Sequence, residues 1–134
     1  PIDAEKIRTL DRRILRAKTF EESLLVLQVR DNGRDVLQTL LRHPEIRRYT
    51  IAAAVSDDID LDSDENTIWG IFTRFDCARD ILFSEQTFIG TVPRYSGVLG
   101  IDATWKEGYP EPLKMEETVI RHVDTYWDTL WTKR

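Results

Sequence analysis

The chain has 134 residues, the size of a single domain that buries roughly two thirds of its unfolded surface. Its formal net charge of −5 argues against a general affinity for nucleic acid, because phosphate binding depends on positive charge. A single cysteine excludes an internal disulfide, and no apolar run approaches the ~20 residues of a membrane span, so we expect a soluble cytoplasmic protein.

The N-terminal segment is predicted to be a helix over residues 3–18. Ile7, Leu10 and Ile14 recur there at helical spacing and give it one apolar stripe. Lysine and arginine are frequent in the same segment, which we interpret as a solvated face or an intersubunit contact rather than a membrane-binding helix. We therefore treat residues 1–22 as a linker or docking helix.

A β-α-β unit is predicted next. Residues 23–29 and 49–55 are short apolar runs typical of strands that are buried on both faces. Between them lies a helix that ends before Pro44, because the residue before a proline is pushed out of helical geometry. Its apolar face consists of Val36, Leu37, Leu40 and Leu41. The two strands should be parallel and joined by a right-handed crossover.

An acidic turn follows the second strand and contains Asp57, Asp58 and Asp60. Asp62 is predicted to cap the next helix while Glu65 reaches back toward it. The apolar face of this helix is predicted to hold Ile68, Ile71, Phe72 and Phe75.

The second half of the chain contains two further strands, at residues 81–83 and 98–104, separated by a loop. Gly90, Pro93 and Gly97 punctuate this loop over residues 84–97. Loops of this length are often functional. The best candidates for contacting a carboxylated substrate or closing over a site are Arg94, Tyr95 and Ser96.

Residues 113–131 are predicted to form a helix with a broad apolar stripe that ends in two tryptophans. Such a stripe needs a surface to cover, either its own sheet or another subunit. The predicted fold class is therefore α/β, a three-layer β-α-β-α-β unit with a mainly parallel sheet and an amphipathic helix at each end.

One hypothesis is that the acidic turn binds a metal ion, because aspartates alternate from Asp58 to Asp64 as the ligands of a calcium loop do. Ser63 stands where that loop needs glycine, and Trp69 stands in place of its bidentate glutamate. A magnesium site at the end of a parallel strand is the other metal alternative. We prefer the simpler reading, in which these carboxylates accept hydrogen bonds from turn N–H groups.

No catalytic set can be assembled from the other reactive side chains. His43 and His122 have no nucleophile near them in sequence, and Cys77 lacks partners at zinc-binding spacing. The mixed charges of Arg74, Asp76, Arg79 and Asp80 predict an internal ion-pair network. We also expect the Asp102 carboxylate to accept hydrogen bonds at the end of its strand, with Thr104 as a cap.

The chain contains two ordered motifs. The first runs from the acidic turn through Ile68-Trp69-Gly-Ile-Phe-Thr-Arg74 to Arg79-Asp80-Ile81, and the second is Pro93-Arg-Tyr-Ser-Gly-Val-Leu-Gly-Ile-Asp102-Ala-Thr104. Together they resemble the C-terminal domain of UbiD-type decarboxylases. The matching positions within them are Asp57, Asp58, Asp60, Trp69, Arg74, Asp80, Asp102 and Thr104. Val98 departs from the family, which frequently has lysine in that segment.

The resemblance implies that catalysis and cleft formation belong to different domains. Family members use prenylated flavin mononucleotide (FMN) to add or remove a carboxyl group on aromatic or unsaturated acids, and the cofactor, its metal ions and the catalytic residues belong to a preceding domain. It implies no catalytic, cofactor-binding or metal-binding residue in this chain, whose residues 23–112 would form one wall of the cleft. Residues 113–134 would dock onto a catalytic domain or large subunit, or make contacts within a homo- or hetero-oligomer.

Three hypotheses follow. The first is the C-terminal domain, or a separate small subunit, of a UbiD-like (de)carboxylase, not catalytic as this chain alone. The second is a non-catalytic assembly or regulatory protein that keeps the fold. The third is a small α/β enzyme that uses the acidic turn with a divalent metal.

Overall fold

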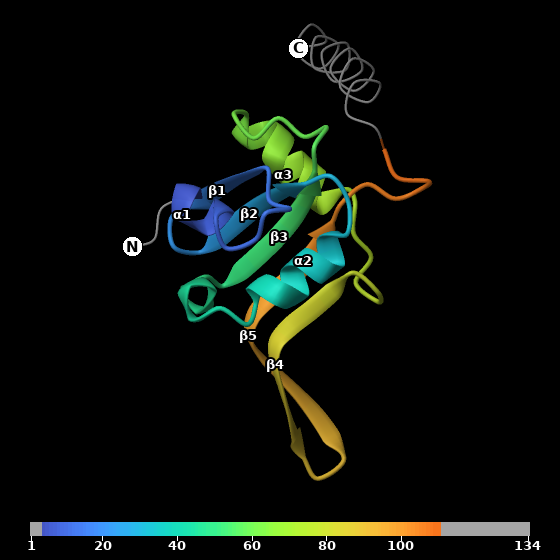
Figure 1. Ribbon diagram of the computed structural model, residues 1–134. Coiled ribbons are helices and arrows are strands. Elements are labelled where there is room, and N and C mark those ends of the chain that lie inside the picture. The colour runs from blue at the N-terminus through green and yellow to red at the C-terminus, as the bar shows by residue number, and fades with distance from the viewer. Residues whose placement is uncertain (1–3, 111–134) are drawn as a thin grey trace, which may run out of the picture.

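The structure, a computed structural model, describes residues 4–110. These residues form a five-stranded sheet with the strand order β1-β2-β3-β5-β4 (Figure 1). Pairing is parallel between β2 and β3 and between β3 and β5, and antiparallel where each edge strand meets its neighbour. The prediction of an α/β fold is confirmed, whereas the sheet is mixed, with both edge strands antiparallel.

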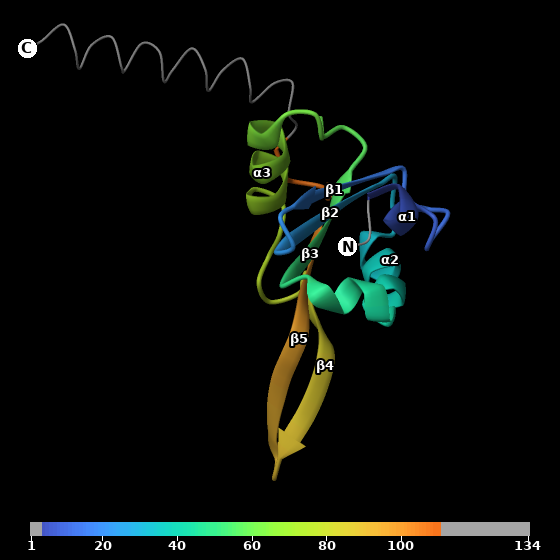
Figure 2. The ribbon, with the colours of Figure 1, turned by 90° about the vertical axis from the view of Figure 1, so that its left-hand side faces the viewer.

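Strands β2 (Leu24–Val29) and β3 (Ile51–Ser56) form the centre of the sheet, as predicted. Their apolar runs are continuous because helices cover both faces of the sheet (Figure 2). Alternate side chains of β3 therefore enter two separate cores: Ala52 and Ala54 belong to one, and Ala53 and Val55 to the other.

Helix α2 (Gly33–Leu40) connects β2 to β3 and buries the predicted apolar face. It ends before the predicted proline stop, where the 3-10 helix η1 (Pro44–Arg48) begins. Leu37 and Leu40 are fully buried in the core on this side of the sheet, together with Ile46 from η1. Burying a side chain of this size stabilises the fold by about 1.5–3 kcal/mol.

Helix α3 (Asp64–Phe72) covers the opposite face of the sheet (Figure 2). Its N-cap is Ser63, which accepts a hydrogen bond from the Asn66 N–H at 3.2 Å, so the predicted Asp62–Glu65 capping box is wrong. The Asp62 carboxylate instead pairs with Arg16 at 2.8 Å. Helix boundaries are ambiguous by one or two residues from sequence alone, so spacing does not separate Asp62 from Ser63 as the cap.

The predicted buried face of α3 is also only partly right. Ile71 is buried, but Phe72 is 61% exposed. Thr67 and Gly70 lie against the sheet instead, because Ile59 packs close to Gly70 and leaves no room there for a larger side chain. The helix therefore presents phenylalanine to the outside and small residues to the core.

The N-terminal helix predicted over residues 3–18 is much shorter. Helix α1 spans Ala4–Arg8, and the chain then forms β1 (Arg16–Phe20), which pairs with β2. Ile7 and Ile14 are both buried in the same core, as their spacing suggested, but Ile7 lies in α1 and Ile14 in the connection between α1 and β1. A free edge of β2 favours the strand, because an antiparallel partner satisfies its backbone groups.

The loop predicted over residues 84–97 is a β-hairpin. Strands β4 (Ile81–Ile89) and β5 (Val92–Ala103) are joined by the turn Gly90-Thr91 and run antiparallel, so the strand predicted at residues 81–83 pairs with β5 and does not extend the parallel part of the sheet. The hairpin extends well beyond the body of the sheet (Figures 1 and 2). We call its outer part, residues 84–97, the hairpin arm.

The base of the hairpin arm depends on Gly97. Its φ of +83° lies in the region that favours glycine, and an added Cβ would overlap Ser84 Oγ, which accepts the Val98 N–H at 2.8 Å. We expect Gly97→Ala to lower the free energy of unfolding by about 2–3 kcal/mol, from backbone strain and overpacking together. Urea unfolding measures this change.

Gly90→Ala is the matched control for that substitution. Gly90 also has a positive φ, of +64°, but nothing lies within 4 Å of an added Cβ. We expect it to cost only the backbone term, about 1 kcal/mol. Equal losses at the two glycines would contradict the role assigned to Ser84.

Among residues 4–110, no helix combines the length and apolar character needed to cross a membrane. The helix predicted over residues 113–131 lies outside the described residues.

Candidate functional site

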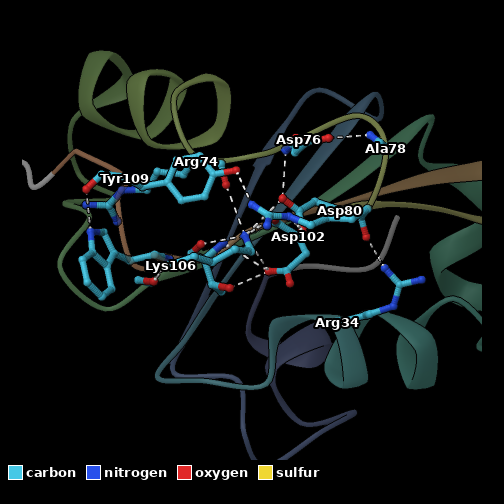
Figure 3. A network of polar contacts seen from close by, with 12 residues as sticks. Arg34, Arg74, Asp76, Ala78, Asp80, Asp102, Lys106 and Tyr109 are labelled. Carbon is cyan, nitrogen blue, oxygen red and sulfur yellow. Dashed lines mark hydrogen bonds and ion pairs between the residues drawn. The ribbon is translucent and has the colours of Figure 1, made fainter.

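A polar network lies where β3 and β5 end side by side. Because these strands are parallel, Ser56 at the end of β3 and Asp102 near the end of β5 come to the same edge of the sheet. The loop after α3 adds Arg74 and Asp80, and the chain after β5 adds Lys106 (Figure 3). The Ser56 hydroxyl accepts the Trp105 N–H at 2.6 Å and ties this chain back to β3.

Arg74 is the most deeply buried charged side chain of this network, with a side-chain exposure of 0%. Its guanidinium donates two parallel hydrogen bonds to Asp58, at 2.8 and 2.9 Å, and further bonds to the Pro110 carbonyl. The Trp69 ring lies 5.5 Å from the guanidinium, within cation–π range. Arg74 thus joins the acidic turn, helix α3 and the end of the described chain.

Lys106 holds the other half of the network. Its ammonium donates to the carbonyls of Asp102, Thr104 and Arg74 at 2.8, 2.9 and 3.2 Å. The carboxylates of Asp80 and Asp102 lie 3.5 and 3.8 Å from the same nitrogen. Three carbonyls and two carboxylates therefore surround one ammonium, and the charge of Lys106 offsets that of two largely buried acids.

Asp102 also fixes the end of its own strand. Its Oδ1 accepts the Thr104 N–H at 3.2 Å and the Thr104 hydroxyl at 2.5 Å, as predicted from the sequence. A Cβ added to Gly33, the first residue of α2, would lie 2.6 Å from the same oxygen. Glycine is therefore required for α2 to approach β5 this closely.

Arg79 and Tyr109 lie on the outer side of the network. The Arg79 guanidinium donates a hydrogen bond to the Tyr109 hydroxyl at 2.9 Å, and this bond raises the pKa of Arg79 above its usual value. Arg34 from α2 donates to the Arg79 carbonyl at 2.6 Å and connects the helix to this loop.

The network is a closed set of internal contacts. Among residues 4–110, every buried side-chain nitrogen and oxygen has a hydrogen-bond partner, and no three acidic, histidine or cysteine side chains gather to hold a metal ion. The polar groups of the network are therefore already engaged with one another. The chemistry they support is positional: they hold two loops and α2 rigidly at one edge of the sheet.

The predicted motif residues fall into two groups. Asp58, Trp69, Arg74, Asp80 and Asp102 meet in the network, as does Thr104. Asp57 is exposed in the acidic turn, and Asp60 accepts the Asp62 N–H at 2.9 Å, an ordinary turn contact. The predicted ion-pair network exists, but Arg74 pairs with Asp58 rather than with its sequence neighbours.

The candidate substrate residues lie away from this network. Arg94, Tyr95 and Ser96 are on β5 in the hairpin arm and are exposed, on a strand rather than the predicted loop. Tyr95 stacks on Phe83 with ring centroids 5.2 Å apart, and the Ser96 hydroxyl donates to Glu85 at 3.4 Å.

Lys106 is the residue of the network that the sequence did not indicate. A single lysine after a strand carries no periodic or motif signal. Its role depends on Asp80, which is 26 positions away in the chain, and on carbonyl groups whose directions only the fold determines.

Comparisons with known proteins agree with this architecture. The family model of the UbiD C-terminal domain, described as "3-octaprenyl-4-hydroxybenzoate carboxy-lyase C-terminal domain", matches residues 11–103. An uncharacterized protein of Archaeoglobus fulgidus is 31% identical over 93 residues, which cover 60% of this chain and 19% of that protein.

Two groups of solved structures share the fold. An evolved dimeric form of the UbiD-class enzyme HmfF from Pelotomaculum thermopropionicum, in complex with prFMN, has a TM-score of 0.55 at 16% identity, covering 80% of this chain and 24% of that one. Vanillic acid decarboxylase of Sedimentibacter hydroxybenzoicus has a TM-score of 0.56 in both its open and its closed form. The identities are 13% and 14%, with coverage of 92% and 90% of this chain and 32% and 30% of those chains. The chain thus spans about a fifth to a third of the proteins it matches.

Proposed function

The chain belongs to the 3-octaprenyl-4-hydroxybenzoate carboxy-lyase C-terminal domain family, and from this membership we propose that it serves as the C-terminal domain or small subunit of a UbiD-like (de)carboxylase acting on an aromatic or unsaturated carboxylic acid. The observation that carries this proposal is the family match over residues 11–103, in a chain that spans only part of its relatives. The holoenzyme uses prenylated FMN, which another domain or subunit binds.

In this proposal the domain forms one wall of the active-site cleft and takes part in oligomer contacts. The closed network around Arg74 and Lys106 supports a wall of fixed shape, since its polar groups are engaged internally. Movement of a rigid wall relative to the catalytic domain would open and close the cleft. Residues 113–134 provide docking contacts to the catalytic domain and to other subunits in this proposal, whereas β1 and the buried Ile7 and Ile14 make residues 4–20 part of the domain itself.

Arg94, Tyr95 and Ser96 contact substrate or help close the site in this proposal. Their exposure on a hairpin that leaves the body of the domain supports a contact with another domain or subunit rather than with this one. Arg94 supplies the positive charge that a carboxylated substrate requires.

The second candidate is a non-catalytic assembly or regulatory protein that keeps the fold. The hairpin arm exposes large apolar side chains, which is typical of a protein-binding surface and fits both candidates. The metal-dependent alternative has weaker support, since Asp58 of the acidic turn is already engaged by Arg74.

Native mass spectrometry of the untagged chain from its source, with an absorbance spectrum of whatever copurifies, separates the two candidates. We expect a larger partner, or a longer parent chain, that carries a flavin chromophore. A flavin-free homo-oligomer with no longer parent chain in the extract would contradict the decarboxylase proposal and favour the assembly protein.

A further inference from the structure

Helix α3 has an exposed apolar stripe on its outer side. Ile68 and Phe72 are four residues apart, so they are neighbours on one face of the helix, and they are 38% and 61% exposed. Phe75, in the loop after the helix, packs edge-to-face against Phe72 with ring centroids 6.2 Å apart. We call these three residues the α3 stripe.

No other element among residues 4–110 covers the α3 stripe. Figure 2 shows α3 as the outermost layer on its side of the sheet, and the hairpin arm projects from the opposite end of the molecule. Helix α2 and η1 pack on the other face of the sheet. Neighbouring apolar side chains that remain this exposed are typical of a surface that another segment covers.

The described chain ends beside the C-terminal end of α3. Arg74, two residues after the helix ends at Phe72, donates to the Pro110 carbonyl from two of its nitrogens, at 3.1 and 2.8 Å. Tyr109 is held in the same place, because its carbonyl accepts the Trp105 indole N–H at 2.9 Å. The point from which the chain continues is therefore fixed at one end of the α3 stripe.

Only residues 111 and 112 separate this fixed point from the helix predicted over residues 113–131. Cα atoms are ~3.8 Å apart along the chain, so residue 113 lies within ~11 Å of Pro110. Pro112 comes directly before the predicted helix, a position that suits proline because its N–H is not needed there. A helix that begins this close to the C-terminal end of α3 can pack on it antiparallel, as in an αα-hairpin.

We propose that the α3 stripe is the docking surface for the first half of segment 113–131 of the same chain, packed antiparallel to α3. The second half, which contains Trp127 and Trp131, remains available for the contacts with other subunits proposed above. The inference does not depend on the decarboxylase activity.

The spacing of apolar residues is the first argument for this occupant. Met115 and Val119 are four residues apart, like Ile68 and Phe72. With residue 113 near the end of α3, Met115 comes opposite Phe72 and Val119 opposite Ile68, because four residues advance either helix by ~6 Å. Helix α3 is ~14 Å long, so roughly half of the predicted helix lies along it.

The size of the stripe is the second argument. Phe72 exposes roughly 90–150 Å² of the 150–250 Å² that an aromatic side chain buries. Two separate proteins bury ~1,200 Å² or more in a stable complex, which the α3 stripe cannot supply. A tethered segment needs far less, because its short connection keeps its effective concentration high.

The test is amide hydrogen exchange of the full-length chain, read by mass spectrometry on peptides from residues 113–122. An isolated helix of this length is marginal in water, so undocking exposes its amides. Phe72→Glu places a carboxylate against the apolar side of the segment, and we expect it to raise exchange in these peptides by at least roughly 10-fold. Peptides from β3 and α2 check that the domain remains folded.

Phe88→Glu is the matched control. Phe88 lies on the hairpin arm and is as exposed as Phe72, 64% against 61%, so the substitution adds the same charge far from α3. It should leave exchange in residues 113–122 within a few-fold of the unmodified chain. Peptides that exchange without protection in the unmodified chain, or that both substitutions affect equally, overturn the proposal.

Cross-linking distinguishes the same chain from other occupants. In a Cys77→Ser background, cysteines in place of Ile68 and Val119 should form a disulfide within one chain on mild oxidation. Cysteines in place of Ile68 and Arg121 should not, because Arg121 lies on the other side of the predicted helix.

A disulfide that joins two chains overturns the proposal, because the segment then docks on a second copy. A flavin-bearing partner that Phe72→Glu releases, while exchange in residues 113–122 stays unchanged, also overturns it by showing that the partner covers the stripe. Whether such a partner copurifies with the unmodified chain is a separate measurement, so the proposed function and this inference fail on different results.

Discussion

Replacing Asp58 with alanine is expected to lower the free energy of unfolding by about 3–5 kcal/mol, because it removes the counter-ion of a fully buried guanidinium. Arg74 would keep the Pro110 carbonyl and the Trp69 ring as partners, and neither carries a charge. Urea unfolding measures the loss. The size of the effect follows from the burial of Arg74 rather than from that of Asp58, which is 40% exposed.

The converse substitution should cost less. In Arg74→Met the stem of the side chain still fills the site, and the half-exposed Asp58 can recover water, so we expect a loss of about 1–2 kcal/mol. The double variant Asp58→Ala, Arg74→Met should resemble Arg74→Met alone, because no unpaired cation remains. A larger loss for Arg74→Met than for Asp58→Ala would contradict this account.

Lys106→Met is expected to have an effect of similar size, about 3–5 kcal/mol, since it leaves two largely buried carboxylates without their shared cation. The three carbonyls around the ammonium would also lose a donor. The variant keeps the length and apolar stem of lysine, so the loss reports on the charge rather than on packing.

A double-mutant cycle with Asp80→Asn tests the charge argument directly. Alone, Asp80→Asn removes one partner of Lys106 and should destabilise the domain. In the Lys106→Met background it removes a buried like charge, so its cost should shrink or change sign. Strictly additive effects of the two substitutions would show that Lys106 acts through packing alone.

Much of the central fold could be predicted from the sequence. The runs that became β2, β3 and α2 are long and apolar enough that few alternatives can bury them, and the proline at position 44 marks a boundary for any helix. The motifs from Asp57 to Asp80 and around Asp102 likewise identified the family. Local chemistry decides these features, because the signal and the structure lie in the same few residues.

The elements that were wrong depend on contacts far along the chain. Glycines at positions 90 and 97 are equally compatible with an irregular loop and with the turn and base of a hairpin. The hairpin forms because β5 pairs with β3 on one side and with β4 on the other. The segment containing Ile14 has helical spacing, yet the open edge of β2 converts the residues after it into a strand. The spacing of apolar residues predicts which side chains are buried, but it does not predict whether a helix, a strand or a loop contains them.

The sequence by itself determined the α/β class, the two central strands, the helix between them and the family to which the chain belongs. Only the tertiary structure decided that Arg74 pairs with Asp58, that Lys106 lies between Asp80 and Asp102, and that residues 84–97 form a hairpin arm. The physical reason is the range of the interactions. Hydrophobic periodicity and turn chemistry act between near neighbours, whereas ion pairs and strand register join groups that only the folded chain brings into contact.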